Sequence, residues 1–346
     1  MIASQIALQV GAVIRLELKK TFFSRRGLWV YLLAFLPCTL FLGHAIDVMR
    51  SRDFTREIAA ERPVATEALQ SIQSGMTIEQ VEAKLGPPNS TRVLDVRGHS
   101  QTWLRYTDGT STYSFHFDDG ELHGISIHEV GNFEDDAIIF ATVFQFFYLR
   151  LAIFFGCVGI FINLFRGEMI DKSLHFYLLS PIRREVLVIG KYLAGLIATI
   201  VIFCTSTALQ LWFLALPRAH APNLHVAAYV GVTALACLGY GSVFLAAGLL
   251  FKNPMLAAAV VLLWEAANIF LPSALKKISI IFYLQSLCPV VAPPEQQTNP
   301  ILALLTSSAE PTPAPLAILG LFVVTGLVLA YAARKARTLE INYSAD

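Results

Sequence analysis

Residues 168–195 read EMIDKSLHFYLLSPIRREVLVIGKYLAG and place a ladder of acidic and basic side chains between two long apolar runs. Before Pro181 the apolar side chains recur at helical spacing, and the charged ones fall largely on another face. Pro181 ends that helix, and Lys191 begins the next apolar run. The pattern predicts a short amphipathic helix that lies along a membrane surface and presents charges to a soluble partner.

The composition of the whole chain is that of a membrane protein. Of 346 residues 55% are hydrophobic and only 15% are charged, whereas a soluble domain has about 25% charged residues. Six apolar stretches are long enough to cross a bilayer as helices: Leu28–Ile46, Phe144–Phe165, Val188–Leu216, Val226–Phe251, Met255–Leu271 and Leu316–Ala333. We expect an α-helical polytopic membrane protein with six transmembrane helices and a small α+β extracytoplasmic domain between helices 1 and 2.

The distribution of lysine and arginine predicts the topology, because cytoplasmic loops carry an excess of these residues. Residues 1–27, 166–191 and the C-terminal tail are basic, whereas residues 48–137 hold 8 basic and 15 acidic residues. Both termini are therefore expected in the cytoplasm. Residues 28–47 form transmembrane helix 1, or alternatively a cleaved signal peptide, which would leave five spans.

Within residues 1–27, apolar residues recur at near-helical spacing over 2–18, and Arg15, Lys19 and Lys20 follow the last of them, Ile14. This predicts a helix lying along the cytoplasmic surface; the alternative is a disordered terminus.

The five cysteines are scattered without metal-ligand spacing, so we expect neither disulfides nor a metal site.

Residues 48–137 are too long for a loop without structure of its own. Thr77 and Gln80 form a capping-box pattern before a short amphipathic helix, and Asp108-Gly109 and Asp119-Gly120 predict hairpin turns between strands. One or two helices on a three- or four-stranded antiparallel sheet are expected, with a core at about 70–128. Metal binding is one interpretation of His116, His123 and His128; histidines on a solvated sheet edge are the other.

The string GMTIEQVEAKLGPPNS, with TWLRYTDGTSTYSFHFDDGELHGISI after it, resembles the SmpA/OmlA-type module of bacterial envelope proteins. The resemblance implies an α+β fold and a role in contacts, not catalysis. The module either binds an extracytoplasmic protein partner or serves as a spacer.

The membrane part resembles the ABC-2-type transporter permeases. The residues that carry the resemblance are Glu168, Leu178-Leu179, Pro181-Ile182-Arg183-Arg184, Glu185 and Gly190-Lys191. It implies that residues 166–190 couple to an ATPase, with Glu168, Asp171, Lys172, Pro181, Arg183, Arg184, Glu185 and Lys191 as the coupling residues. A loop that merely obeys charge bias would explain neither the acidic residues nor the amphipathic pattern.

The chain contains no GxxxxGK[ST] phosphate loop, so we expect it to be no enzyme and to have no cofactor of its own. By the resemblance, ATP and Mg would lie on separate ABC ATPase subunits. Two copies of the ATPase would serve a dimer of identical permeases. Other expected partners are membrane lipids, and nucleic acid is not expected.

Arg150 and Glu265 stand in apolar runs, where a charge is costly and usually pairs or lines a polar cavity. We expect them to form an ion pair or to line an outer cavity near the substrate path. The alternative is that Arg150 reaches the outer head groups and that Glu265 is protonated or reaches the same interface. Residues 273–315 contain an apolar run too short to cross, which is expected to re-enter the membrane or lie on its outer side.

Two functions fit these observations. The first is the permease subunit of an ATP-driven transporter for a lipid-like or amphiphilic substrate, in either direction. The second is a membrane anchor or envelope sensor whose extracytoplasmic module binds a partner protein.

Overall fold

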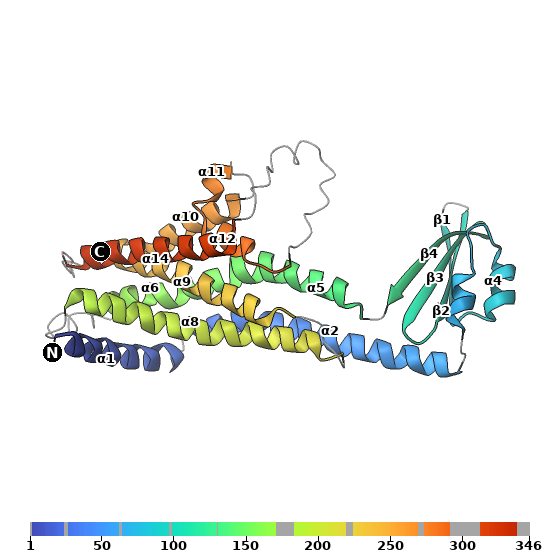
Figure 1. The fold of residues 1–346 in the computed structure, drawn as a ribbon, viewed down its shortest axis with the longest axis horizontal. Coiled ribbons are helices and arrows are strands. Elements are labelled where there is room, and N and C mark those ends of the chain that lie inside the picture. The colour runs from blue at the N-terminus through green and yellow to red at the C-terminus, as the bar shows by residue number, and fades with distance from the viewer. Residues whose placement is uncertain are drawn as a thin grey trace. The chain divides into compact units, whose positions relative to one another are not determined.

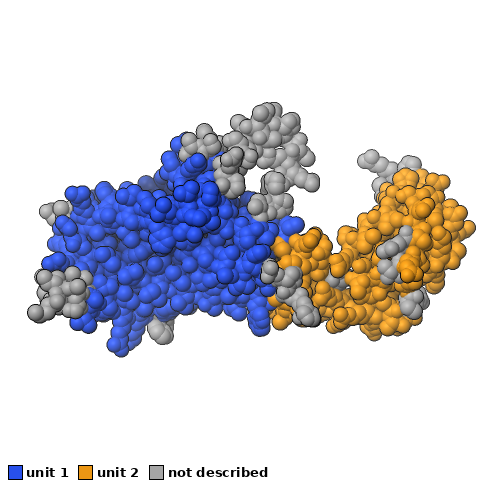
Figure 2. All heavy atoms as spheres, viewed as in Figure 1, with its two compact units in different colours: residues 1–40, 138–212, 221–346 blue, residues 41–137, 213–220 orange. Residues whose placement is uncertain are grey.

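The chain forms two compact units (Figure 2). The computed structural model describes residues 2–23, 27–61, 64–96, 99–129, 131–170, 183–218, 224–268, 273–290 and 312–337. The first unit comprises Met1–Leu40, Ile138–Trp212 and Ala221–Asp346, and the second comprises Phe41–Ala137 and Phe213–His220.

The first unit is helical (Figure 1). The helices that contribute to it are α1 (Ile2–Phe23), α2 (Leu28–Glu61), α5 (Phe133–Thr142), the π-helix η2 (Val143–Ile153), α6 (Phe154–Ile170), α8 (Arg184–Ala215), α9 (Val226–Leu250), α10 (Pro254–Ala267), α11 (Ser273–Lys276), α12 (Ile280–Ser286) and α14 (Ala314–Ala336). Within the described residues, five helical stretches are long and apolar enough to cross a membrane: Leu28–Glu61, Phe133–Ile170, Arg184–Ala215, Val226–Leu250 and Ala314–Ala336. The prediction of a polytopic helical membrane protein is thereby confirmed.

The expected fifth span is shorter than the sequence pattern indicated. Helix α10 has 14 residues, whereas a span needs about 20. Residues 269–272, where the predicted span would continue, lie outside the described part of the chain. The structure therefore supports five spans by length, and the sixth stays a prediction.

Close packing in the helical unit depends on small residues that let helices approach. At Gly248 of α9, an added Cβ would lie 2.9 Å from the carbonyl oxygen of Ile162 in α6, so these two backbones are almost in contact. Aromatic rings also pack between these two helices: the ring of Phe154 in α6 lies edge-on to that of Phe244 in α9, with ring centroids 4.9 Å apart. The α6–α9 pair is thus a tightly packed part of the unit.

The second span contains an unusual backbone. Residues Val143–Ile153 form a π-helix of 11 residues, which continues into α6. π-Helical turns are rare and are found mostly as short bulges, often at functional sites. Arg150, one of the two intramembrane charges noted in the sequence, lies in this segment.

The second unit contains a four-stranded antiparallel sheet in the order β1-β2-β3-β4. The strands are β1 (Ser90–Val96), β2 (His99–Thr107), β3 (Ser111–Asp118) and β4 (Glu121–Glu129), preceded by helices α3 (Thr66–Gln70) and α4 (Ile78–Leu85). Phe115 of β3 lies opposite Leu104 of β2, and both are buried in a core shared with Val81 and Leu85 of α4. The predicted helix-on-sheet module is confirmed as a four-stranded meander.

Local signals in this unit are confirmed in detail. The Thr77 side chain accepts a hydrogen bond from the Gln80 backbone N–H, and the Gln80 side chain accepts one from the Thr77 backbone N–H. The turn between β3 and β4 places Asp119 at φ 49° and Gly120 at φ 90°, as a tight hairpin turn requires. The Tyr106 hydroxyl donates to the carbonyl of Gly86 at 2.9 Å, which joins the end of α4 to the sheet.

The turn between β2 and β3 is organised by one carboxylate. Asp108 Oδ1 accepts hydrogen bonds from the backbone N–H groups of Thr110 at 2.9 Å and Ser111 at 2.7 Å. Partial burial disfavours ionisation of Asp108, but these hydrogen bonds outweigh it and hold its pKa below the ordinary value. The ionised Asp108 side chain therefore stabilises this turn.

His116 and His128 lie at separate positions in the sheet. His116 of β3 stacks on Trp103 of β2 with ring centroids 4.9 Å apart. His128 pairs with Thr112, whereas His116 pairs with Gly124, which precedes His128 by four residues on β4. The described residues contain no group of three or more metal-ligating side chains, so the geometry offers no support for a shared metal site.

Candidate functional site

Helix α1 packs directly on the start of α8. A Cβ placed on Gly190 would lie 2.8 Å from Cγ1 of Val13, and Val13 is 3% exposed. Only glycine permits so close an approach without displacing α1. The sequence pattern placed Gly190-Lys191 at the start of a span. In the structure, α1 packs against α8 at these two residues.

Lys191 is fully buried and all of its hydrogen-bonding capacity is used. Its Nζ donates to Glu17 Oε1 at 2.6 Å, to Glu168 Oε2 at 2.8 Å and to the carbonyl of Leu164 at 2.8 Å. Its ammonium also lies 5.4 Å from the ring centroid of Phe165. One cation thus joins α1, α6 and α8.

A second lysine completes the cluster. Lys20 Nζ lies 3.0 Å from Glu168 Oε1, and its side chain is 51% exposed whereas that of Glu168 is 9% exposed. The cluster of Glu17, Lys20, Glu168 and Lys191 therefore balances two carboxylates with two ammonium groups. We call these four residues the α1 clamp.

The α1 clamp brackets the segment that the sequence assigned to coupling. Glu168 lies near the end of α6 and Lys191 lies in the first turns of α8, so the chain between them leaves and returns at the clamp. Removing one partner of a buried ion pair typically costs about 3–5 kcal/mol, because a charge is then left buried without compensation. The two ends of the coupling segment are therefore firmly held to α1.

This arrangement corrects part of the predicted docking surface. Glu168 and Lys191 are 7% and 0% exposed, so their side chains do not lie on a surface that a soluble partner could contact. They are buried because each finds opposite charge on a helix distant in sequence. The clamp's second acid, Glu17, was missed as a functional residue; its one signal was being the single acid in a basic N-terminal segment.

The other predicted coupling residues have different environments. Arg183 is exposed, Arg184 donates to the carbonyl of Arg337 at 3.0 Å, and Glu185 forms an ion pair with the Arg337 side chain. The start of α8 is thus tied to the end of α14. Asp171, Lys172 and Pro181 lie outside the described residues, as does the amphipathic helix expected there.

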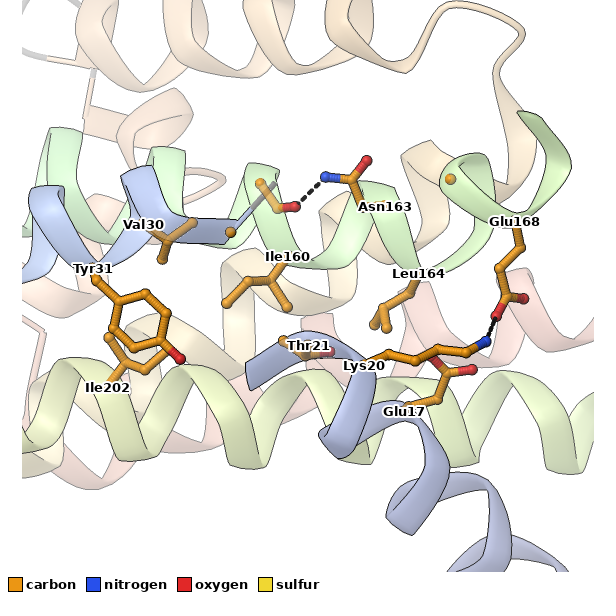
Figure 3. Close-up of a pocket in the computed structure, with 13 residues that line it drawn as sticks. Glu17, Lys20, Thr21, Val30, Tyr31, Ile160, Asn163, Leu164, Glu168 and Ile202 are labelled. Carbon is orange, nitrogen blue, oxygen red and sulfur yellow. Dashed lines mark hydrogen bonds and ion pairs between the residues drawn. The ribbon is translucent and has the colours of Figure 1, made fainter. Parts of the chain in front are cut away.

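A cavity of about 380 Å³ lies beside the clamp, between α1, α2, α6 and α8. Figure 3 shows Lys20 reaching from α1 to Glu168 at one side of it, and Tyr31 and Ile202 at the other. Its walls are mainly apolar and include Val30 and Leu164. The site therefore combines an apolar chamber with a charged edge.

Glu265, which the sequence places in an apolar run, binds a helix terminus. Its carboxylate accepts hydrogen bonds from the Ser279 hydroxyl at 2.6 Å and from the backbone N–H groups of Ile280 at 3.1 Å and Ile281 at 3.0 Å. These N–H groups belong to the first turn of α12, where a carboxylate is electrostatically favoured. Glu265 thus joins α10 to α12.

Arg150 lies over an aromatic ring. Its guanidinium carbon is 5.5 Å from the centroid of the Phe146 ring. Within the described residues no hydrogen bond or ion pair joins Arg150 to Glu265. The structure therefore shows no direct ion pair between these two residues, which was one of the alternatives left open by the sequence.

Together these features define a class: a multi-pass helical membrane protein with a clamped N-terminal helix, a charged segment between two spans and a separately folded sheet unit. The profile of the family described as ABC-2 family transporter protein matches residues 12–337. The chain therefore belongs to the ABC-2 transporter family, which confirms the resemblance of the membrane part. The resemblance of residues 70–128 to SmpA/OmlA modules stays a prediction. No curated protein matches the chain, and no solved structure matches it.

Proposed function

We propose that this chain is the permease subunit of an ATP-driven ABC-2 transporter and that separate ATPase subunits dock on residues 168–185, in which Glu168 is buried and anchors the segment rather than contacting the ATPase. The observation that carries the proposal is the α1 clamp at both ends of this segment. A push on the segment would reach Glu168 on α6 and Lys191 on α8 together, and both hold Glu17 or Lys20 of α1. Two spans and the N-terminal helix would then move as one body.

The assembly that we propose contains two permeases, identical to each other, and two ATPases that carry ATP and Mg. It resides in the bacterial inner membrane with both termini in the cytoplasm and the sheet unit on the extracytoplasmic side. The apolar helices with few intramembrane charges suit a lipid-like or amphiphilic substrate. The sheet unit, which has its own core, would contact an extracytoplasmic protein partner.

The test is reconstitution with the candidate ATPase chain. The ATPase is expected to co-purify with this protein and to hydrolyse ATP faster in its presence. Arg183→Glu reverses an exposed charge in the docking segment and is expected to lower the stimulation severalfold, whereas Arg334→Glu reverses an exposed charge in α14 and serves as the matched control. Absence of any bound ATPase, or equal stimulation by both variants, would reject coupling through this segment.

A further inference from the structure

The cavity beside the α1 clamp has the composition of a site for an apolar chain. Four of its wall residues, Val30, Ile160, Leu164 and Ile202, come from three helices and are each at most 6% exposed. An apolar chamber of this kind gains nothing from holding water, whereas an aliphatic chain in it would replace water contacts by packing. Its volume of about 380 Å³ lies in the usual range for small-molecule sites.

The charged edge of the cavity presents a cation rather than an anion. Among the residues that the structure describes, three charged side chains line it: Glu17, Lys20 and Glu168. The side chains of Glu17 and Glu168 are 3% and 9% exposed and both face Lys191, whereas that of Lys20 is 51% exposed. An entering head group therefore meets the ammonium of Lys20 first. The Lys20 ammonium can leave the Glu168 carboxylate for a ligand at a small cost in free energy, because a half-exposed ion pair is weak. Glu168 would still be paired with Lys191.

The surroundings of the cavity are also basic. Lys20 is shared with a shallow surface groove on α1 that Arg15 and Lys19 line. On the other side, Gly159 and Asn163 are shared with a second groove, lined by Arg166 and Lys252. Four further cations thus flank the cavity, and they favour a negatively charged head group.

From this geometry we infer that the cavity between α1, α2, α6 and α8 binds one anionic amphiphile, with its aliphatic chain against Val30, Ile160, Leu164 and Ile202 and its phosphate or carboxylate on Lys20. Binding needs only the helical unit in a membrane. That the amphiphile is also cargo rests on the proposed function. The head group would replace Glu168 as the partner of Lys20. Ligand binding would therefore break one ion pair of the α1 clamp.

The experiment uses the full chain in phosphatidylcholine nanodiscs and a photoreactive phosphatidylglycerol with a diazirine in its acyl chain. Phosphatidylcholine that carries the same photoreactive acyl chain is the reference probe. Labelled peptides are located by mass spectrometry. We expect labels on the peptides that contain the wall residues, and a higher yield with phosphatidylglycerol than with the reference. Glycerophosphate, which lacks the chain, is expected not to compete.

Two variants isolate the head-group contact. Lys20→Ala is expected to lower the phosphatidylglycerol yield about fivefold, and Lys20→Arg is expected to retain it. Arg334→Ala removes an exposed cation from α14 and should leave labelling unchanged. Ile160→Phe narrows the chamber and should reduce labelling by both probes.

The inference would be overturned by equal labelling from both probes, by full competition from glycerophosphate, or by a Lys20→Ala variant that labels like the wild type. These outcomes are separate from those of the proposed function. Selective labelling without ATPase stimulation would keep the site and reject the transporter. Stimulation with unselective labelling would keep the transporter and reject the site.

Discussion

Replacement of Lys191 by methionine tests the α1 clamp. Lys191→Met keeps the length of the side chain but removes the cation that Glu17, Glu168 and the Leu164 carbonyl share. Glu17 is 2% exposed, so its carboxylate loses a close counter-charge in a place that water does not reach. A cost of about 3–5 kcal/mol is expected.

The comparison is Lys20→Met, which removes the other cation of the clamp. Because the Lys20 side chain is 51% exposed, its pair is expected to contribute about 0–1 kcal/mol. At about 2 °C per kcal/mol for a large chain, Lys191→Met should lower the thermal midpoint by roughly 6–10 °C, and Lys20→Met by roughly 2 °C or less. Thermal unfolding in one detergent, with hydrogen exchange of the α1 amides, measures both.

A compensating change decides whether buried charge is the cause. In the Lys191→Met background, Glu17→Gln removes the uncompensated carboxylate and is expected to restore part of the lost stability, although it removes a further polar partner. If the double variant is less stable than Lys191→Met, or if Lys191→Met is no worse than Lys20→Met, the clamp does not hold α1 as the structure indicates.

Three further predictions concern other contacts. Gly190→Ala places a Cβ against Val13 and is expected to cost about 1–3 kcal/mol by overpacking; Val13→Ala in the same chain should recover much of it in thermal unfolding, and an undiminished loss would count against the contact. Glu265→Leu leaves two buried N–H groups of α12 without an acceptor and is expected to cost about 1–3 kcal/mol, with faster hydrogen exchange confined to α12; uniform change would contradict this assignment. The pKa of Asp108 is lowered in the folded protein, so the stabilisation by its carboxylate is complete above the unfolded pKa of about 3.9 and is lost as the pH falls below that value. Amide protection factors in the β2–β3 turn should therefore decrease when the pH is lowered below about 4. The Asp108→Asn variant should show no such dependence on pH.

Much of the sheet unit could be predicted because its signals are local. The capping box of Thr77 and Gln80 joins residues three apart, and the hairpin turn at Asp119-Gly120 joins neighbouring strands. Such interactions are set by side-chain chemistry and backbone preference within a few residues, so a single sequence displays them. The same holds for the long apolar helices, whose length and composition decide their environment.

The environment of the charged residues could not be predicted in this way. Glu168 and Lys191 lie 23 residues apart, and their motif resembles an exposed docking segment, yet both are buried. The reason is Glu17, which is 174 residues from Lys191 in sequence. Nothing local to either residue indicates that α1 returns to pack on Gly190.

The sequence by itself therefore determined that this protein is a helical membrane protein with an inserted helix-and-sheet module, because hydrophobic length and turn chemistry are local properties. The ABC-2 type was indicated only by the resemblance of its motifs. Only the tertiary structure decided which charges face the solvent and which close the α1 clamp, and where an apolar cavity is left beside it. A charge is buried only when its partner is brought to it by packing, and that partner lies on another helix.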